Sequence, residues 1–115
     1  YAVPAGVYLA LIIGNILYSS KTAGFLWQLV ALHQAGFILC VWAHLACMLT
    51  DPGYVPLHTA VSDGVPTCQK CLGSKPSRAH HCKVCRRCVL RMDHHCIFTN
   101  NCIGIGNRKF FLQFC

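Results

Sequence analysis

The four residues Asp93-His94-His95-Cys96 lie in the part of this chain that is richest in side chains able to bind metal ions. The 35 residues from Cys68 to Cys102 contain seven cysteines and four histidines. Two tetrahedral zinc sites, each with three thiolates and one imidazole, would use six of these cysteines and two of these histidines. One cysteine then remains, and Cys96 has a histidine two residues before it and an aspartate three residues before it. A free thiol beside a base is the arrangement that nucleophilic cysteine chemistry requires.

Zinc is the metal that this set of side chains favours, because thiolates and imidazoles are mixed at short chelating spacings. Spacing alone does not decide which ligand serves which ion. Both sites would have four protein ligands and no open coordination position, so we expect structural rather than catalytic zinc. The two Cys-x-x-Cys pairs, Cys68–Cys71 and Cys82–Cys85, resemble paired knuckles, and we find no repeat with a long period.

The composition separates a membrane part from a basic part. Hydrophobic residues make up 55% of the 115 residues and charged residues only 11%, which is too apolar for a soluble globular domain. Nine of the ten Lys and Arg residues fall between Lys70 and Lys109, whereas the first 50 residues contain only Lys21 and no acid. The formal charge of +7 falls to about +5 when six thiolates bind two zinc ions. A positive charge of this size suits a partner that carries phosphates. Alternatively, the basic residues only follow the positive-inside rule, by which cytosolic loops beside a membrane are rich in Lys and Arg.

Two apolar segments predict an α-helical transmembrane hairpin over residues 1–50, with helices at about 1–18 and 25–50 and a polar connector at Ser19–Gly24. One basic residue lies in the connector and nine follow Thr50. The connector should therefore be lumenal or extracellular, and the cysteine-rich region cytosolic. Cytosolic thiols are kept reduced, which favours metal binding over disulfides.

The remainder of the chain is divided by turn signals. Thr50-Asp51-Pro52-Gly53 predicts the end of a helix with no chemical role, and residues 51–66 are expected to be a linker. Residues 67–109 should form a small irregular domain with short β-hairpins, in which zinc replaces a hydrophobic core. The apolar run at 110–115 predicts the start of a third transmembrane helix, so we expect the chain to be a piece of a longer protein.

Motifs spread over about half of the chain identify a family. They are Thr50-Asp51-Pro52-Gly53, Cys68-x-x-Cys71, Lys75-Pro76-x-Arg78-x-x-His81-Cys82-x-x-Cys85-x-x-Cys88, Asp93-His94-His95-Cys96, Cys102 and Asn107-x-x-Phe110. Together they resemble the cysteine-rich domain of the DHHC protein S-acyltransferases, or palmitoyltransferases. So many positions matched at fixed spacing are far more specific than a lone Cys-x-x-Cys.

The resemblance implies a role for each of these side chains. It implies an interleaved pair of zinc sites, with Cys68, Cys71, His81 and Cys88 on one ion and Cys82, Cys85, His95 and Cys102 on the other. It further implies that Cys96 is the nucleophile, that His94 is the general base, and that Asp93 orients and polarises His94.

The resemblance also implies protein S-palmitoyltransferase activity. Cys96 would take a long-chain acyl group from palmitoyl-CoA or a similar acyl-CoA and pass it, in a ping-pong reaction, to cysteines of membrane-proximal substrate proteins. Basic side chains of the domain are candidates for binding the CoA phosphates, and we favour Lys75, Arg78 and His80 over Lys83, Arg86, Arg87 and Arg91. The protein would lie in the membrane of the Golgi, the endoplasmic reticulum or the cell surface, with its active site facing the cytosol. Family members usually have Pro-Trp after the motif cysteine, whereas this chain has Ile97-Phe98, a difference that we expect to affect rate and acyl-length preference.

Two other functions are compatible with parts of the sequence. A membrane-anchored zinc module that binds proteins or anionic lipid, without catalysis, is the main alternative. Nucleic-acid binding by basic zinc knuckles is disfavoured by the membrane segments and by the lack of stacking aromatics between Thr67 and Arg91. Cys40 and Cys47 need no function, since cysteine is a common small apolar side chain within helices.

Overall fold

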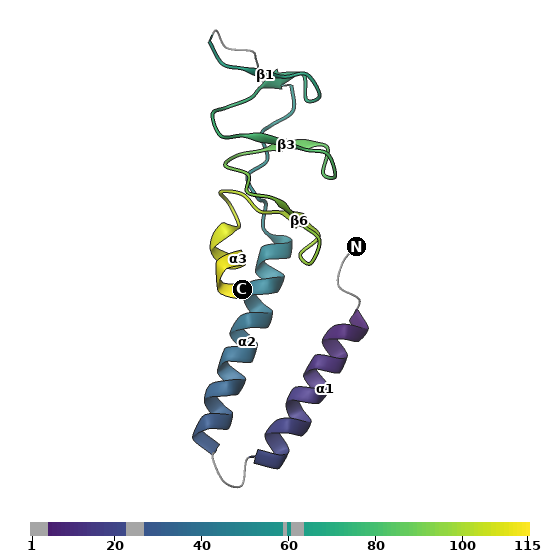
Figure 1. Cartoon of the computed structure of the whole chain (residues 1–115), viewed down its shortest axis with the longest axis vertical. Helices are drawn as coiled ribbons and strands as arrows, with labels where there is room; N and C mark the ends of the chain where they lie inside the picture. Colours follow the sequence, from purple (N-terminus) through teal and green to yellow (C-terminus); the bar gives the residue numbers. More distant parts are fainter. Residues whose placement is uncertain (1–4, 23–26, 59, 61–63) are drawn as a thin grey trace.

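The computed structural model describes residues 5–22, 27–58, 60 and 64–115. Helices α1 (Ala5–Thr22) and α2 (Trp27–Leu49) are followed by six short strands and by helix α3 (Arg108–Phe114). The molecule is elongated, with principal extents of 67 × 25 × 15 Å. The helices form one end and the strands stack beyond the C-terminal end of α2, with the β1 hairpin farthest from the helices (Figure 1).

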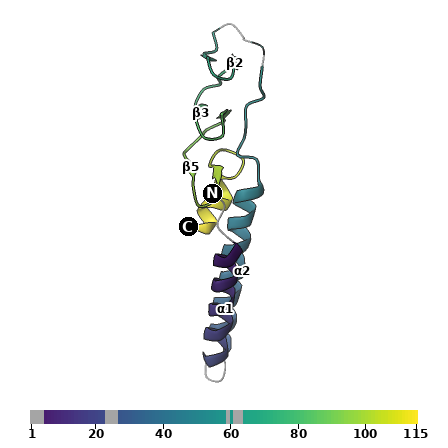
Figure 2. The same ribbon diagram turned by 90° about the vertical axis from the view of Figure 1, so that its right-hand side faces the viewer.

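Helices α1 and α2 run antiparallel and lie side by side in both views (Figures 1 and 2). Within the described residues, α2 is the one helix that is long and apolar enough to cross a membrane by length and composition. Helix α1 continues to Thr22, so Ser19 to Thr22, expected in the connector, are helical instead. The rest of the expected connector and the first four residues lie outside the described part of the chain.

Polar side chains that interrupt the two apolar segments face one another between the helices. Asn15 of α1 lies 3.1 Å from His33 of α2, and the Gln34 amide contacts the Ser19 hydroxyl. A third contact joins Tyr8 to His44. Hydrogen bonds between polar side chains hold helices together where the surroundings are apolar. These contacts explain how two helices with few polar residues are fixed in register.

Three similar antiparallel hairpins form the cysteine-rich region. They pair β1 (Thr67–Cys68) with β2 (Gly73–Ser74), β3 (His80–Cys82) with β4 (Arg87–Val89), and β5 (His95–Cys96) with β6 (Asn101–Cys102). Each turn ends at a residue with positive φ, namely Leu72 at 50°, Arg86 at 54° and Asn100 at 48°. The first cysteine at each hairpin turn recurs every 14 residues, at Cys68, Cys82 and Cys96. The sequence therefore contains a repeat that its analysis missed.

The Asp-Pro-Gly segment after α2 packs into the domain instead of leading away from it. The Asp51 carboxylate accepts hydrogen bonds from the N–H groups of Gly53 and Tyr54 at 2.7 and 2.9 Å. The Gly53 carbonyl accepts from Leu90 N–H at 2.8 Å, and Val55 is buried in the core. The first five residues of the expected linker thus belong to the folded domain, and the turn has a structural role that the sequence analysis did not assign.

Two glycines allow this segment to approach the chain after β6. A Cβ atom on Gly104 would collide with the Pro52 carbonyl and lie 2.6 Å from Val89 Cγ1, and one on Gly106 would collide with the Asp51 carbonyl. Gly106 N–H donates to the Pro52 carbonyl at 3.1 Å. Helix α3 then begins at Arg108, two residues before the expected start, and returns along the C-terminal half of α2 (Figure 1). Its Phe110 ring lies 5.5 Å from that of Trp42.

Candidate metal centres and active site

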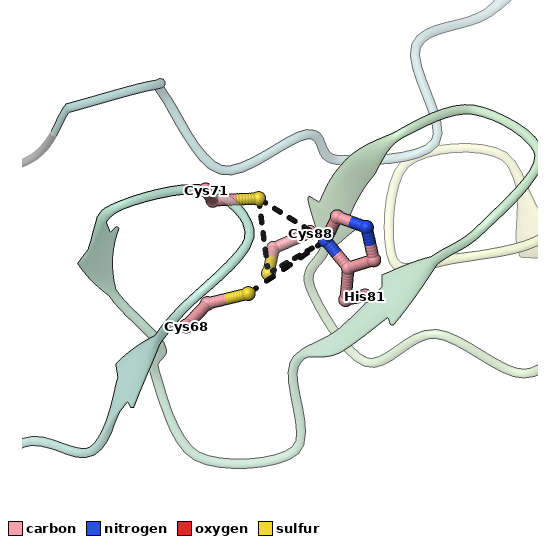
Figure 3. Close-up of side chains that lie close together, drawn as sticks. All are labelled: Cys68, Cys71, His81 and Cys88. Atoms are coloured by element: carbon pink, nitrogen blue, oxygen red, sulfur yellow. Dashed lines mark hydrogen bonds between the residues drawn. The ribbon is translucent and has the colours of Figure 1, made fainter.

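The first cluster of ligand-type side chains joins the turn of the β1–β2 hairpin to the strands of the next hairpin. Cys68 and Cys71 come from the turn, whereas His81 and Cys88 face each other across β3 and β4. The His81 Nδ1 atom lies 3.6, 3.2 and 4.0 Å from the sulfurs of Cys68, Cys71 and Cys88. All four side chains point toward one centre (Figure 3).

The second cluster repeats this arrangement one hairpin further along the chain. Cys82 and Cys85 come from the β3–β4 turn, and His95 and Cys102 are paired across β5 and β6. The His95 Nδ1 atom lies 3.7, 3.4 and 3.7 Å from the sulfurs of Cys82, Cys85 and Cys102. Each cluster therefore ties one hairpin to the next.

Both clusters could hold a metal ion. A tetrahedral zinc ion, with bonds of about 2.3 Å to sulfur and about 2.0 Å to nitrogen, keeps its ligand atoms about 3.5–3.8 Å apart. The measured separations lie around these values, and the donor atoms are those that zinc prefers. The eight side chains brought together are the eight for which the sequence analysis expected this role.

Without a cation, the thiols within one cluster have opposed acid–base properties. Backbone N–H donors, led by that of Cys71, lower the pKa of the Cys68 thiol to about 7. Burial raises the pKa of the Cys88 thiol to about 12, and neighbouring thiols add to this effect. Burial likewise raises the pKa of Cys102 in the second cluster. A bound cation would allow all three thiols of a cluster to ionise.

Cys96 occupies in the third hairpin the position that Cys68 and Cys82 occupy in the first two. Three residues later the first two hairpins have a second cysteine, whereas the third has Thr99. Cys96 belongs to neither metal cluster among the described residues, although its neighbour His95 is in the second. The Cys96 side chain is buried in a cluster with Cys47 of α2 and Ile103, against which Phe110 and Phe111 pack. The repeat thus places a thiol without a metal partner at the helix end of the domain.

His94 lies beside Asp93 and α3. Its Nδ1 atom is 3.5 Å from Asp93 Oδ2, and its ring meets Phe111 edge-on at 5.2 Å. Backbone hydrogen bonds of 2.8 Å from Asp93 N–H to the Ile103 carbonyl, and from Ile103 N–H to the His94 carbonyl, hold this segment. Phe111 packs both on His94 and on the cluster that contains Cys96, so the two side chains approach the same part of α3. Within the described residues, no hydrogen bond joins His94 to Cys96.

A polar cavity of about 250 Å³ opens beside this segment. Arg78 and His80, two of the three expected phosphate-binding residues, line it together with Arg91 and Arg108. Lys75, the third, does not line it. Asp93 contributes to the same wall, so the cavity reaches the Asp-His-His-Cys segment. The sequence analysis counted Arg91 among the basic residues but could not foresee Arg108, which α3 brings back to the domain.

An apolar cavity of about 190 Å³ lies on the helix side of the same segment. It is enclosed by residues of α1, α2 and α3 and by the turn after Cys96: Tyr8, Leu11, Phe37, Cys40, Val41, His44, Phe98 and Phe114. Asp93 of this segment thus lines the polar cavity, and Phe98, two residues after Cys96, lines the apolar one.

Two asparagines that the sequence analysis did not assign join the domain to α2. The Asn101 amide donates to the carbonyls of Cys47, Met48 and Thr50 at 3.0–3.2 Å. The Asn107 amide donates to the carbonyls of Cys47 and Cys102, and its oxygen accepts from Gly104 N–H at 3.0 Å. Both side chains satisfy carbonyls at the end of α2 that lack helical partners. The Asn107-x-x-Phe110 spacing was the only signal for either residue.

Comparisons with known proteins agree with this site. Residues 62–115 match the family model of the DHHC palmitoyltransferase. Palmitoyltransferase ZDHHC3 of Rattus norvegicus is 44% identical over 87 residues, which cover 66% of this chain and 29% of that protein. Probable protein S-acyltransferase 15 of Arabidopsis thaliana is 48% identical over 84 residues, covering 64% of this chain and 33% of that protein. Palmitoyltransferase ZDHHC16A of Danio rerio is 35% identical over 100 residues, or 87% of this chain and 26% of that protein.

The fold and the site define a cysteine-rich domain with two potential metal centres and one free buried thiol, attached to an apolar helix. Residues 62–115 carry the DHHC domain of the palmitoyltransferase family, as the sequence motifs predicted. The chain spans about a third or less of the length of these curated relatives.

Proposed function

We propose that the protein of which this chain is part is a protein S-acyltransferase that uses Cys96 as its nucleophile. The observation that carries the proposal is the position of Cys96, between two fixed metal-cluster residues, His95 and Cys102, yet outside both clusters. The family match covers this region, and relatives that match it are named palmitoyltransferases.

Zinc is the metal we propose for both clusters, because three thiolates and one imidazole at tetrahedral separations suit it best. Zinc bound at both sites would supply rigidity, since neither donor set leaves a coordination position open for substrate. The chain's own contribution is to hold Cys96 on a strand whose neighbours, His95 and Cys102, are both immobilised.

In the first half of the reaction, we propose that His94 accepts the proton of the Cys96 thiol, directly or through water. The thiolate then attacks the carbonyl carbon of the acyl-CoA thioester, a new C–S bond forms, and CoA leaves as the thiolate and takes up a proton. Asp93, with its Oδ2 atom 3.5 Å from His94 Nδ1, would orient the imidazole. In the second half, a cysteine of the protein substrate attacks the Cys96 thioester, and Cys96 is regenerated. One thioester replaces another, so no energy source is needed.

The two cavities suit the two ends of an acyl-CoA. Arg78, His80, Arg91 and Arg108 would bind phosphates of the CoA portion by charge-assisted hydrogen bonds. The apolar cavity between the helices would take part of the acyl chain, whose burial is favourable by about 0.8 kcal/mol per methylene. This assignment keeps Arg78 and His80 of the expected set and puts Arg91 and Arg108 in the place of Lys75.

We further propose that α1 and α2 both span a bilayer, with the domain of residues 67–109 on the cytosolic side, and that α3 begins a further span. The partners would be acyl-CoA, lipid and proteins with cysteines near the membrane. The membrane would be that of the Golgi, the endoplasmic reticulum or the cell surface.

The test is to supply the purified full-length protein with labelled palmitoyl-CoA and to locate the label by mass spectrometry. A hydroxylamine-sensitive acyl group on Cys96, which then moves to an added cysteine peptide, is the expected result. Absence of any acyl-Cys96, while both metal ions are present, would leave the non-catalytic membrane-anchored zinc module as the function.

A further inference from the structure

One buried histidine of α2 has no part in the reaction described above. His44 is 5% exposed, and both of its ring nitrogens have hydrogen-bond partners. The Tyr8 hydroxyl of α1 contacts Nδ1, and Nε2 lies 3.2 Å from the carbonyl oxygen of Phe98. A carbonyl oxygen only accepts, so Nε2 must carry the proton. Nδ1 faces the Tyr8 hydroxyl, so the ring links Tyr8 of α1 to the Phe98 carbonyl.

The carbonyl that His44 holds belongs to the turn that immediately follows Cys96. Ile97 and Phe98 are 67% and 64% exposed, so packing within the chain holds them only weakly. Thr99 hydrogen-bonds back to the Cys96 carbonyl at 3.5 Å, a contact within the turn itself. In the described part of the chain, no other hydrogen bond joins Ile97 or Phe98 to a helix. His44 therefore holds the Phe98 carbonyl of this turn, while Thr99 of the same turn meets the Cys47 side chain of α2.

The same three residues form one wall of the apolar cavity between the helices. Tyr8, His44 and Phe98 line it, and its other lining residues are apolar apart from the Cys40 thiol. The Phe114 ring of α3 lies 4.5 Å from the His44 ring and covers it from the other side. Polar groups in such surroundings are costly when their hydrogen bonds are lost, because water cannot replace the partner. The chain of hydrogen bonds from Tyr8 through His44 to Phe98 therefore has one favoured arrangement.

We propose that Tyr8 and His44 are positioning residues for acyl transfer, a proposal that rests on the proposed function. By holding the Phe98 carbonyl, they fix the place of the Phe98 ring at the cavity and the course of the backbone from Cys96. The acyl chain of a bound acyl-CoA then meets a wall of defined shape, so the pair contributes to the choice between chains of different length. Neither residue touches the reacting atoms.

Three variants of the full-length protein in detergent separate this role from a general effect on the helices. His44→Phe keeps a planar ring but removes the donor to Phe98, and His44→Gln keeps an N–H donor on a side chain of similar reach. Tyr8→Phe removes only the hydroxyl. The matched control is His33→Phe, because His33 also joins α1 to α2, through Asn15 at 3.1 Å. It lies about three helical turns before His44 in α2, away from the Phe98 contact.

The measurements are zinc content and the rate of Cys96 acylation with lauroyl-, myristoyl-, palmitoyl- and stearoyl-CoA. His44→Phe should retain zinc, lower the rate with palmitoyl-CoA by about tenfold, and change the relative rates among the four substrates. Tyr8→Phe should have a smaller effect in the same direction. The acylation rate of His44→Gln should stay within about threefold of that of the unchanged protein, and the rate of His33→Phe should fall in the same range.

Three results would overturn the proposal. The first is a His44→Phe protein with unchanged rates and unchanged chain preference. The second is an equal loss in His44→Phe and His33→Phe, which would indicate helix packing alone. The third is loss of zinc in His44→Phe, which would make His44 a structural residue. Failure of the unchanged protein to form acyl-Cys96 is a different result, since it refutes the proposed function itself.

Discussion

At the scale of single residues, Cys96 has a free thiol because the third hairpin has a threonine, Thr99, where the first two hairpins have a second cysteine. Cys68 and Cys82 each have a second cysteine three residues on, and each pair meets a histidine and a cysteine of the next hairpin. Cys96 has Thr99 at that position, and in the described part of the chain its hairpin is followed by helix α3. A hydroxyl is a poor ligand for zinc, so the third turn has the geometry of a knuckle without the means to bind a metal. Its remaining thiol is available for chemistry.

The three adjacent residues His94, His95 and Cys96 should therefore differ in their effects on metal binding and acylation. Cys96→Ser should abolish acyl-enzyme formation and retain both metal ions, because a serine hydroxyl is nearly isosteric with the thiol but far less ionised. His94→Ala should also retain the metal and slow acylation of Cys96 by about 10²–10⁴, the usual worth of a general base. His95→Ala should lose one metal ion and destabilise the domain, because His95 Nδ1 lies among three sulfurs.

Metal content and acyl labelling measured side by side on the three variants test these roles. Labelling of the His94→Ala protein should slow rather than vanish, and should approach completion at long reaction times. Loss of metal in His94→Ala with retention in His95→Ala would invert the two assignments. A hydroxylamine-sensitive acyl group on the Cys96→Ser protein would place the acyl group on another cysteine.

The cationic cavity gives a second prediction. Arg78→Gln and Arg91→Gln should each raise the KM for palmitoyl-CoA about tenfold with little change in kcat, because a charge-assisted hydrogen bond to phosphate contributes about 1.5–3 kcal/mol. Lys75→Gln removes a charge of the same sign outside the cavity and serves as the control. Initial rates at varied palmitoyl-CoA concentration provide the measurement. A rise in KM for Lys75→Gln as large as that for Arg78→Gln would mean that Lys75 binds the CoA phosphates as well. That result would contradict the assignment of phosphate binding to the cavity residues.

At the scale of elements, the cysteine spacings predicted the short hairpins, and the apolar runs predicted the helices. The partners of these elements could not be predicted, because they depend on distances between residues far apart in the chain. Asn101 and Asn107 satisfy carbonyls of α2 more than 50 residues earlier. The ligand sets followed from the family resemblance and not from spacing. The 14-residue repeat was present in the sequence, but Thr99 breaks its pattern at the third turn.

The contact between the Asp-Pro-Gly turn and the chain after β6 predicts the effect of adding one methyl group. Gly104→Ala would place a Cβ against the Pro52 carbonyl and 2.6 Å from Val89 Cγ1, so backbone must shift. We expect a loss of about 1–3 kcal/mol in stability, typical of overpacking at a tight site. Gly36→Ala in α2 is the matched control, since its Cβ would meet nothing within 4 Å. Thermal unfolding of the two purified variants measures the difference, and equal melting temperatures would contradict the close contact.

At the scale of the whole molecule, the domain has little apolar core apart from its cysteines. Besides these, the buried hydrophobic residues of the described cysteine-rich region are Val55, Ala79, Val89 and Ile103. Small domains with so little buried apolar surface depend on metal ions or disulfides for their stability. No disulfide occurs among the described cysteines.

Removal of metal should therefore unfold the domain and leave the helices intact. A strong chelator, added to the purified protein, should release two zinc ions per chain and expose the domain to protease, because binding energy is folding energy in such sites. Circular dichroism should meanwhile retain the helical signal of α1 and α2. Metal analysis that finds one ion or none in the native protein would contradict the pairing. Resistance to protease after complete removal of metal would contradict the structural role.

The arrangement of α1 against α2 gives the last prediction. Among the described helices, α2 alone meets the length and composition expected of a membrane span, but α1 lies along it and pairs its polar side chains with those of α2. A helix so paired must run through the same layer as its partner, because the contacts at Tyr8, Asn15 and Ser19 follow one another along its length. The start of α1 at Ala5 and the cysteine-rich domain should then lie on the cytosolic side, and Lys21 on the other. Epitope tags inserted directly before α1 and beside Lys21, probed with protease on sealed membranes, test this. Protection of the tag before α1 would mean that α1 does not cross the bilayer, and protection of the domain would reverse the orientation.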